Sequence, residues 1–161
     1  MKLGYLAFAL VVTLQLSAQD WQKGNLSDPM NDKAYTAFGL EGKGVNENIT
    51  GTLGMFCANG KFQFARLGIN GMTFHYDDFA ALRNPPYVTN MRVRTGNKTE
   101  TKGFLVTQDM KSAQFSKQEM EKILNAGGAV FQFADGLGTF HYIQFAGASP
   151  GADLKAVCGF K

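Results

Sequence analysis

Residues 53–64 read LGMFCANGKFQF, and this stretch decides the fold class. Apolar side chains alternate with other residues on both sides of the central Asn-Gly pair, at Leu53, Met55, Cys57, Phe62 and Phe64. A period of two residues is typical of a β-strand that buries one face. Asn-Gly tolerates the positive φ angles that a tight hairpin turn needs. The stretch therefore predicts two antiparallel strands joined by a tight turn.

The same alternation recurs along most of the chain. It pairs Met91 with Val93, Phe104 with Val106, Phe131 with Phe133, and Ile143 with Phe145. With further strands expected at 35–40 and 73–76, the pattern predicts about eight strands. The chain has 19 glycines, which fall between short apolar runs. They predict many turns, including those at Gly96-Asn97 and Asp135-Gly136.

Two short helices are expected among these strands. Ser116 and Glu119 match a capping box, and the apolar stripe that follows is ended by Gly127-Gly128. A second helix is expected over 153–157, with Ser149-Pro150 at its start. No strand–helix–strand alternation repeats, so the sequence favours a mainly β fold, an antiparallel β-sandwich with two short helices.

Residues 1–18 have the layout of a secretory signal peptide. Lys2 gives one positive charge, 3–14 are almost entirely apolar, and Ser17 and Ala18 are small. We expect cleavage after Ala18, a single domain over 19–161, and a periplasmic or secreted location. The apolar run has about a dozen residues, whereas a membrane-spanning helix needs about 20. We therefore expect no membrane span after signal cleavage.

The chain has two cysteines, Cys57 and Cys158. In an oxidising compartment they predict one disulfide, and two buried free thiols are the alternative. The formal net charge is +3, of which Lys2 supplies one, and there is no run of Lys or Arg. This balance gives no reason to expect nucleic acid as a partner.

The N-terminal part of the expected domain carries a recognisable series of motifs. Trp21 is followed by Asp28-Pro29-Met30-Asn31-Asp32, then by a strand, and then by a strand ending in Cys57 before Asn59-Gly60. Asp77-Asp78 and the closing Cys158 come later. This order resembles the TagO/VasI-like family of periplasmic proteins, which is associated with type VI secretion gene clusters. Asn31 stands where that family usually has threonine, and Phe56 where it usually has arginine.

The resemblance implies a disulfide-closed β-sandwich that acts by binding, as an accessory or assembly protein at the cell envelope. Its candidate motif residues are Trp21, Asp28, Pro29, Met30 and Asp32. The Asp28-Pro29 pair and Trp21 also have local structural interpretations. Asp28 before Pro29 can cap one helical turn, and Trp21 can anchor the N-terminal segment to the domain.

The sequence offers weak candidates for catalysis or metal binding. His75 lies two residues before Asp77, and His141 lies on another expected strand, but no close ligand spacing accompanies either histidine. There is no Gly-x-Ser-x-Gly nucleophile motif. Asp77 and Asp78 are adjacent, so on a strand they would point to opposite faces. We therefore expect no catalytic residue, no metal site and no cofactor.

Arg92 and Arg94 share one face of an expected strand, with Lys98 and Lys102 across the predicted hairpin. These four residues could bind an anionic glycan or an acidic partner, or they could simply form the solvated side of a half-buried strand. We expect an exported non-enzymatic binding or accessory protein, whose partner is a protein or an envelope component. The alternatives are a small secreted hydrolase directed at the cell wall or at glycans, and a secreted inhibitor.

Overall fold

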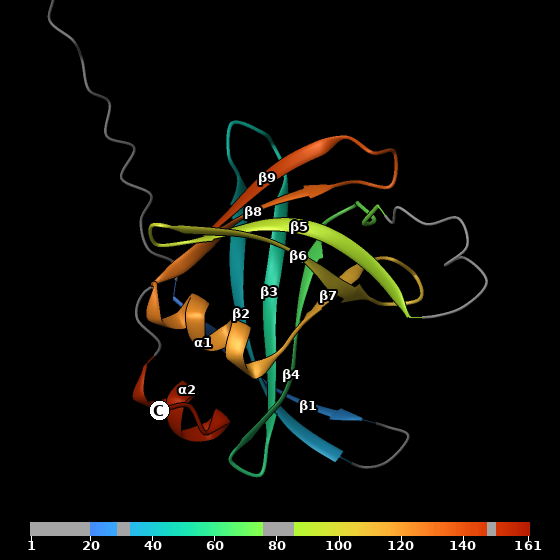
Figure 1. Ribbon diagram of the computed structural model, residues 1–161. Helices are drawn as coiled ribbons and strands as arrows, with labels where there is room; N and C mark the ends of the chain where they lie inside the picture. Colours follow the sequence, from blue (N-terminus) through green and yellow to red (C-terminus); the bar gives the residue numbers. More distant parts are fainter. Residues whose placement is uncertain (1–19, 29–32, 76–85, 148–150) are drawn as a thin grey trace, which may run out of the picture.

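The computed structural model describes residues 20–28, 33–75, 86–147 and 151–161 (Figure 1). In these ranges it has nine strands and two helices, in the order β1 (Gln22–Asp28), β2 (Lys33–Gly44), β3 (Thr50–Ala58), β4 (Lys61–Ile69), β5 (Tyr87–Thr95), β6 (Lys98–Val106), β7 (Ser112–Phe115), α1 (Lys117–Asn125), β8 (Gly128–Ala134), β9 (Phe140–Ala146) and α2 (Ala152–Cys158). All strand pairings are antiparallel.

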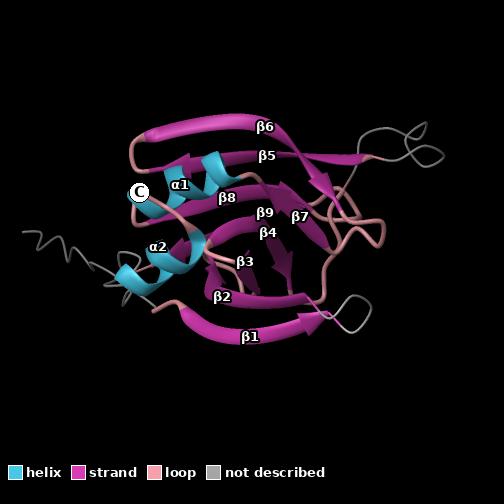
Figure 2. Ribbon diagram, turned by 90° about the horizontal axis from the view of Figure 1, so that it is seen from below, coloured by secondary structure: helices cyan, strands magenta, loops and turns pink. Residues whose placement is uncertain are grey.

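The sheet closes on itself, so the predicted β-sandwich is wrong. The strand order is β1-β2-β3-β4-β7-β6-β5-β8-β9, and β9 pairs back to β2, with Lys43 opposite Gln144 and Gly44 opposite Ile143. Strands β2 to β9 form an eight-stranded barrel, and β1 lies outside it, paired with the first half of β2 (Figure 2). Alternating apolar residues suit sandwiches and barrels equally, because both bury one face of each strand.

Glycine allows the strands to approach closely where the barrel closes. A Cβ atom at Gly42 would lie 2.5 Å from ring atoms of Phe145, and one at Gly51 would lie 2.8 Å from Ile143. Phe145 and Ile143 both belong to β9, the strand that closes the barrel. The missing side chains on β2 and β3 leave room for the large residues of β9.

The order of strands around the barrel departs from their order in the chain. After β4 the ring continues through β7, β6 and β5 before it reaches β8 and β9. Strands β5, β6 and β7 therefore follow one another around the barrel in the reverse of their order in the chain. This arrangement places β5 directly beside β8, at Arg92–Gln132 and Arg94–Val130, and it creates the surface described in the next section.

The predicted inward faces are confirmed for most strands. Fully or almost fully buried residues on these faces include Leu53, Met55, Cys57, Met91, Phe104, Phe131, Phe133, Ile143 and Phe145. They fill the interior together with residues of the other strands, as in small barrels whose lumen is packed with side chains.

The prediction that Phe62 and Phe64 share one buried strand face is wrong. The register shifts between Phe56 and Cys57, so that Cys57 lies opposite Phe62 while Phe56 lies opposite Phe64. Gln63 is an extra residue on β4 between these two pairs, so Phe62 and Phe64 point to opposite faces of the sheet, as at a β-bulge. Phe64 therefore stacks on Phe56, with ring centroids 4.6 Å apart, and both side chains are half-buried.

Helix α1 closes one end of the barrel and begins as predicted. The Ser116 side chain accepts a hydrogen bond from the Glu119 backbone, and the Ser116 backbone donates to Glu119 at 2.7 Å. The buried side chains of α1 are Met120, Ile123 and Leu124. The helix contacts both β4 and β8, which are on opposite sides of the ring. A helix that touches both must lie across the end of the barrel.

Helix α2 lies beside β3 and β4, on the same side of the molecule as α1 (Figures 1 and 2). Cys158 at its end forms the predicted disulfide with Cys57 of β3, with the two Cα atoms 5.1 Å apart. Both cysteines are fully buried. Helix α2 follows Gly151 without a side-chain cap. The predicted Ser149-Pro150 start lies outside the described residues.

One further prediction needs correction, and another cannot be compared. Asp28 is the last residue of β1, opposite Lys33, and the helical turn that it was expected to cap lies outside the described residues. Of the strand expected at 73–76, the described part shows only an isolated bridge between Phe74 and Asp135. Pro29, Met30, Asp32 and Asp77-Asp78 lie outside the described residues. None of the described helices is long and apolar enough to cross a membrane.

Candidate functional site

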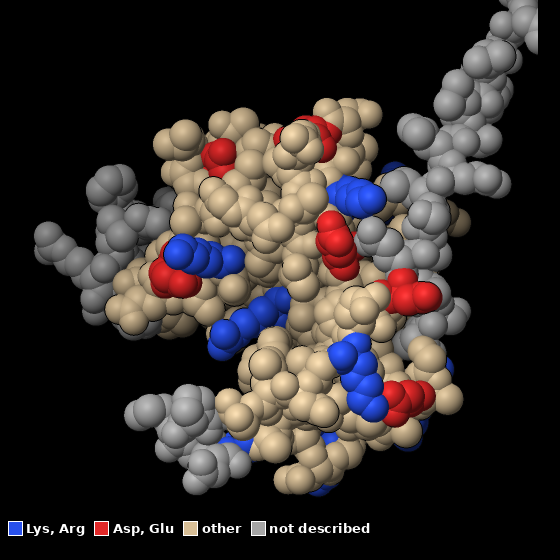
Figure 3. Space-filling model, turned by 180° about the vertical axis from the view of Figure 1, so that it is seen from behind, with Lys and Arg blue, Asp and Glu red and all other residues tan. Residues whose placement is uncertain are grey.

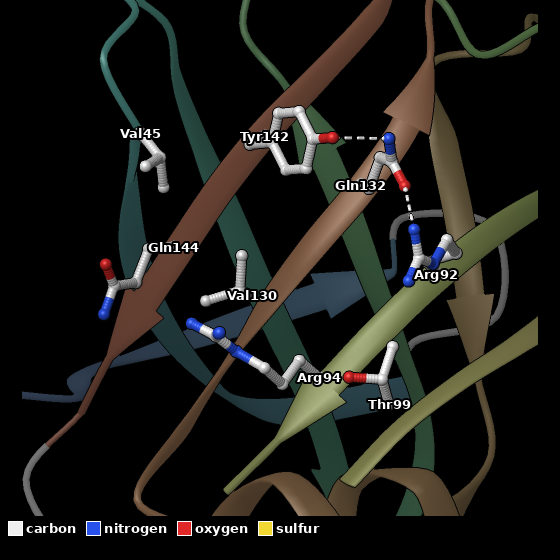
Figure 4. Close-up of a pocket in the computed structure, with 8 residues that line it drawn as sticks. All are labelled: Val45, Arg92, Arg94, Thr99, Val130, Gln132, Tyr142 and Gln144. Atoms are coloured by element: carbon white, nitrogen blue, oxygen red, sulfur yellow. Dashed lines mark hydrogen bonds between the residues drawn. The ribbon is translucent and has the colours of Figure 1, made fainter. Parts of the chain in front are cut away.

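A groove lies on the outer face of the barrel, where β5, β8 and β9 run side by side. It encloses about 270 Å³ and is lined by Val45, Arg92, Arg94, Thr99, Val130, Gln132, Tyr142 and Gln144 (Figure 4). The lining residues come from four strands and from the residue directly after β2.

The strand period explains why the arginines of β5 line this groove. Met91 and Val93 are buried in the barrel, so Arg92 and Arg94 point outward and are exposed. The sequence predicted this alternation. Residues two apart on a strand lie on the same face, about 6.5 to 7 Å apart along it. The two guanidinium groups therefore extend from neighbouring positions of one face.

Strand register arranges the groove in two rows that cross the sheet. The first row begins at Thr99 of β6, which is opposite Arg94, and continues through Val130 to Gln144 of β9. The second row runs from Arg92 through Gln132 to Tyr142. These rows bring together residues that are far apart in the sequence. The sequence analysis identified only the two arginines.

Hydrogen bonds link the side chains of the second row. Arg92 Nη1 donates to Gln132 Oε1 at 3.5 Å, and Gln132 Nε2 donates to Tyr142 Oη at 2.7 Å (Figure 4). The second bond fixes the orientation of the Tyr142 side chain, which is 42% exposed. The groove therefore has an aromatic side chain held in place at one end of this row.

The first row has no such links. Among the described residues, Arg94, Thr99 and Gln144 make no side-chain hydrogen bond or ion pair. The Arg94 side chain extends across β8 toward β9 (Figure 4). A guanidinium, a hydroxyl and an amide are thus available to a ligand along this row.

The predicted basic hairpin is not a single surface. Lys102 lies opposite Met91, on the other face of the sheet from Arg92 and Arg94, and its Nζ is 2.5 Å from Glu119 Oε1 of α1. Lys98 does not line the groove. Only the two arginines of the four basic residues face the groove, and neither forms an ion pair within the described chain.

Among the described residues, no acidic side chain lines the groove. Elsewhere, basic residues are commonly paired with acidic ones, as in Lys122–Glu100 at 3.2 Å. On the face opposite to that of Figure 1, blue and red side chains are scattered and often adjacent (Figure 3). The two arginines thus concentrate positive charge in a lining whose described residues include no carboxylate.

His141 forms a second polar cluster beside the groove. Its Nδ1 lies 2.5 Å from Glu47 Oε2, and its Nε2 lies 3.0 Å from Asp135 Oδ2. With the imidazole protonated, both ring nitrogens donate, one to each carboxylate. The cluster joins the loop after β2 to the hairpin between β8 and β9. Glu47 also accepts a bond from the Tyr142 backbone N at 3.3 Å, and Val45 N donates to Tyr142 O at 3.0 Å.

The two carboxylates favour the charged form of the histidine. The hydrogen bond to Glu47 raises the pKa of His141 above its ordinary value, burial opposes this, and the bond to Asp135 adds to the rise. The hydrogen bond from His141 and the bond from the Thr139 backbone hold the pKa of Asp135 below its ordinary range. The sequence analysis found no close ligand spacing around His141. Glu47 is distant in sequence, so no local pattern could reveal this cluster.

The remaining predicted residues lie apart from the groove. Trp21 is half-buried and packs against the core, and a Cβ atom at Gly147 would lie 3.4 Å from its Nε1. The His75 backbone N donates to Ala134 O at 3.0 Å. In the described ranges, no three His, Cys, Asp or Glu side chains group together as metal ligands.

A second cavity, of about 440 Å³, lies beside the disulfide between β2, β3 and α2. Its described lining contains no charged side chain. The groove of β5, β8 and β9 is therefore the stronger candidate site. Compared with protein-family models, with curated proteins and with solved structures, the chain matches none.

Proposed function

We propose that the protein is a non-enzymatic binding protein that acts outside the cytoplasm and holds an anionic ligand in the groove of β5, β8 and β9. One observation carries the proposal: Arg92 and Arg94 lie on one face of β5, in a concave surface whose described lining contains no carboxylate. Arginine binds carboxylates and phosphates through two parallel hydrogen bonds, and such charge-assisted bonds are the strongest available to a side chain.

The chemistry of the lining supports binding rather than acid–base catalysis at this groove. Arginine stays protonated at all physiological pH values, and glutamine and threonine do not titrate there. His141 lies beside the groove, with each of its ring nitrogens facing a carboxylate. In this arrangement neither nitrogen is free to take a proton from a substrate.

We propose the cell envelope as the setting of this binding. The expected signal peptide would deliver the chain to an oxidising compartment, and the disulfide between Cys57 and Cys158 suits such a compartment. An accessory role at the envelope is what the resemblance to the TagO/VasI-like family implies. The anionic ligand would then be part of an envelope component or of a partner protein.

Titration calorimetry of the purified mature protein tests the binding site. The anions are citrate, inorganic phosphate and oligogalacturonate, each added to wild type, to Arg92→Gln/Arg94→Gln and to Lys61→Gln/Arg66→Gln. The control pair removes the same charge from exposed positions of β4, on the opposite side of the barrel from β8.

At least one of these anions should bind wild type and the control equally. The groove variant should bind it at least about 10-fold more weakly, since each lost charge-assisted bond is worth about 1.5 to 3 kcal/mol. Equal affinity of the groove variant and wild type would refute the assignment of the site.

A further inference from the structure

The groove offers more than positive charge. Its first row presents the side chains of Thr99, Arg94 and Gln144, which have no side-chain partners in the part of the chain that the structure describes, and its second row presents the Tyr142 ring. A hydroxyl and an amide each both donate and accept hydrogen bonds. Sugar hydroxyl groups have the same dual character, and the faces of sugar rings are apolar enough to lie on an aromatic side chain. The groove therefore fits a saccharide as well as an anion.

Its size and openness favour a chain over a small enclosed molecule. The groove encloses about 270 Å³, which is below the roughly 300 to 1,000 Å³ of pockets that surround a small-molecule ligand. It lies across several strands on an open surface, so a ligand can continue beyond it. The two arginines are about 6.5 to 7 Å apart along β5, which suits a ligand whose acidic groups repeat along its length.

A peptide fits this surface less well. An extended peptide commonly binds by adding a strand to a free sheet edge. Strand β8 forms the floor of the groove and is already paired with β5 on one side and β9 on the other, at both Val130 and Gln132. No edge is open there.

We propose that the groove binds a saccharide chain that carries repeated carboxylate groups. Arg92 and Arg94 hold two of the carboxylates, Gln144 and Thr99 hold sugar hydroxyl groups, and the Tyr142 ring lies against a sugar face. This assignment rests on the proposed function and deepens it, because it names the class of anion.

Four probes distinguish this ligand from other anions: trigalacturonate, trimannuronate, the methyl ester of trigalacturonate, and triglutamate. The ester keeps the sugar and removes the charge, whereas triglutamate keeps the charge and removes the sugar. Dissociation constants are measured for wild type, for Arg94→Gln and for Gln144→Leu, which leaves the charge of the groove unchanged. The Lys61→Gln/Arg66→Gln variant serves as the control.

We expect at least one of the two uronate trisaccharides to bind wild type with a dissociation constant below about 1 mM. Arg94→Gln should weaken this binding about 10-fold and Gln144→Leu about 5-fold, with the control unchanged. The ester and triglutamate should each bind at least about 10-fold more weakly. Binding of inorganic phosphate should not respond to Gln144→Leu.

Two results would overturn the saccharide assignment. One is a failure of both uronates to bind while citrate or phosphate binds through the arginines, which leaves the anion-binding function intact. The other is triglutamate binding as tightly as the uronates, which would make an acidic peptide the ligand. If the arginine variants bind every anion as wild type does, the proposed function itself fails.

Discussion

Removal of the Cys57–Cys158 disulfide should cost much of the stability of the domain. The bond closes a loop with a sequence separation of 101 residues. For a loop of this length, the chain-entropy model gives about 4.7 kcal/mol at 25 °C, and strain or residual structure in the unfolded chain lowers that value. We expect the variant Cys57→Ala/Cys158→Ala to lose about 3 to 4 kcal/mol of unfolding free energy.

Urea unfolding followed by tryptophan fluorescence measures this loss. The chain has one tryptophan, Trp21, and it is half-buried against the core. With a urea m-value of about 2 kcal/mol/M, a loss of 3 to 4 kcal/mol lowers the midpoint by about 1.5 to 2 M. Because removal of the bond also changes the unfolded ensemble, the m-value is fitted separately for each protein.

Reduced wild type provides the matched control. It keeps both sulfur-bearing side chains but lacks the covalent bond, so its difference from oxidised wild type isolates the effect of the cross-link. Reduced wild type and the double variant should unfold at similar urea concentrations. A loss below about 1 kcal/mol on reduction would refute the argument that the loop closure stabilises the fold.

Three further predictions test local features. Gly42→Ala should destabilise the fold by about 1 to 3 kcal/mol in urea unfolding, because the new Cβ would collide with the Phe145 ring. Gly39→Ala on the same strand should change stability by less than about 0.5 kcal/mol, and equal effects of the two variants would contradict the closure geometry. Ser116→Ala should cost about 1 kcal/mol through loss of the α1 cap, and no loss would argue against the capping box. The pKa of His141 is raised, so the stability that its cluster provides is complete below the ordinary histidine pKa and is lost as pH rises through the raised value. His141→Gln should remove this pH dependence of stability. An NMR titration that finds an ordinary or lowered pKa for His141 would contradict the cluster.

Local patterns predicted the strands and α1 because their causes are local. Alternation at Met91 and Val93 reflects burial of one strand face, and the Ser116 capping box is complete within four residues. The polar strand Gln22–Asp28 was missed because it lies outside the barrel and buries little, so it has no apolar alternation. Gln63 could not be recognised as a bulge, since a register shift is a property of two strands together.

Barrel closure and the groove were not predictable from the sequence for a different reason. Closure depends on the pairing of Lys43 with Gln144, and the groove depends on the pairing of Arg92 with Gln132. Both pairings join segments that are distant in the chain, and alternation leaves the choice of neighbour open. The sequence did indicate that Arg92 and Arg94 share one face of a strand. That Lys102 lies on the other face of the sheet follows only from the strand register, which pairs Lys102 with Met91.

Arginine side-chain NMR is the most direct test of the claim that the groove of β5, β8 and β9 binds an anionic ligand. Nε–Hε signals are followed while trigalacturonate is added to the protein, with Arg66 of β4 as an internal reference on another part of the barrel. The account predicts that the signals of Arg92 and Arg94 shift together and saturate at one dissociation constant while the Arg66 signal stays in place. Saturable binding that shifts Arg66, or that leaves both Arg92 and Arg94 unmoved, would contradict it.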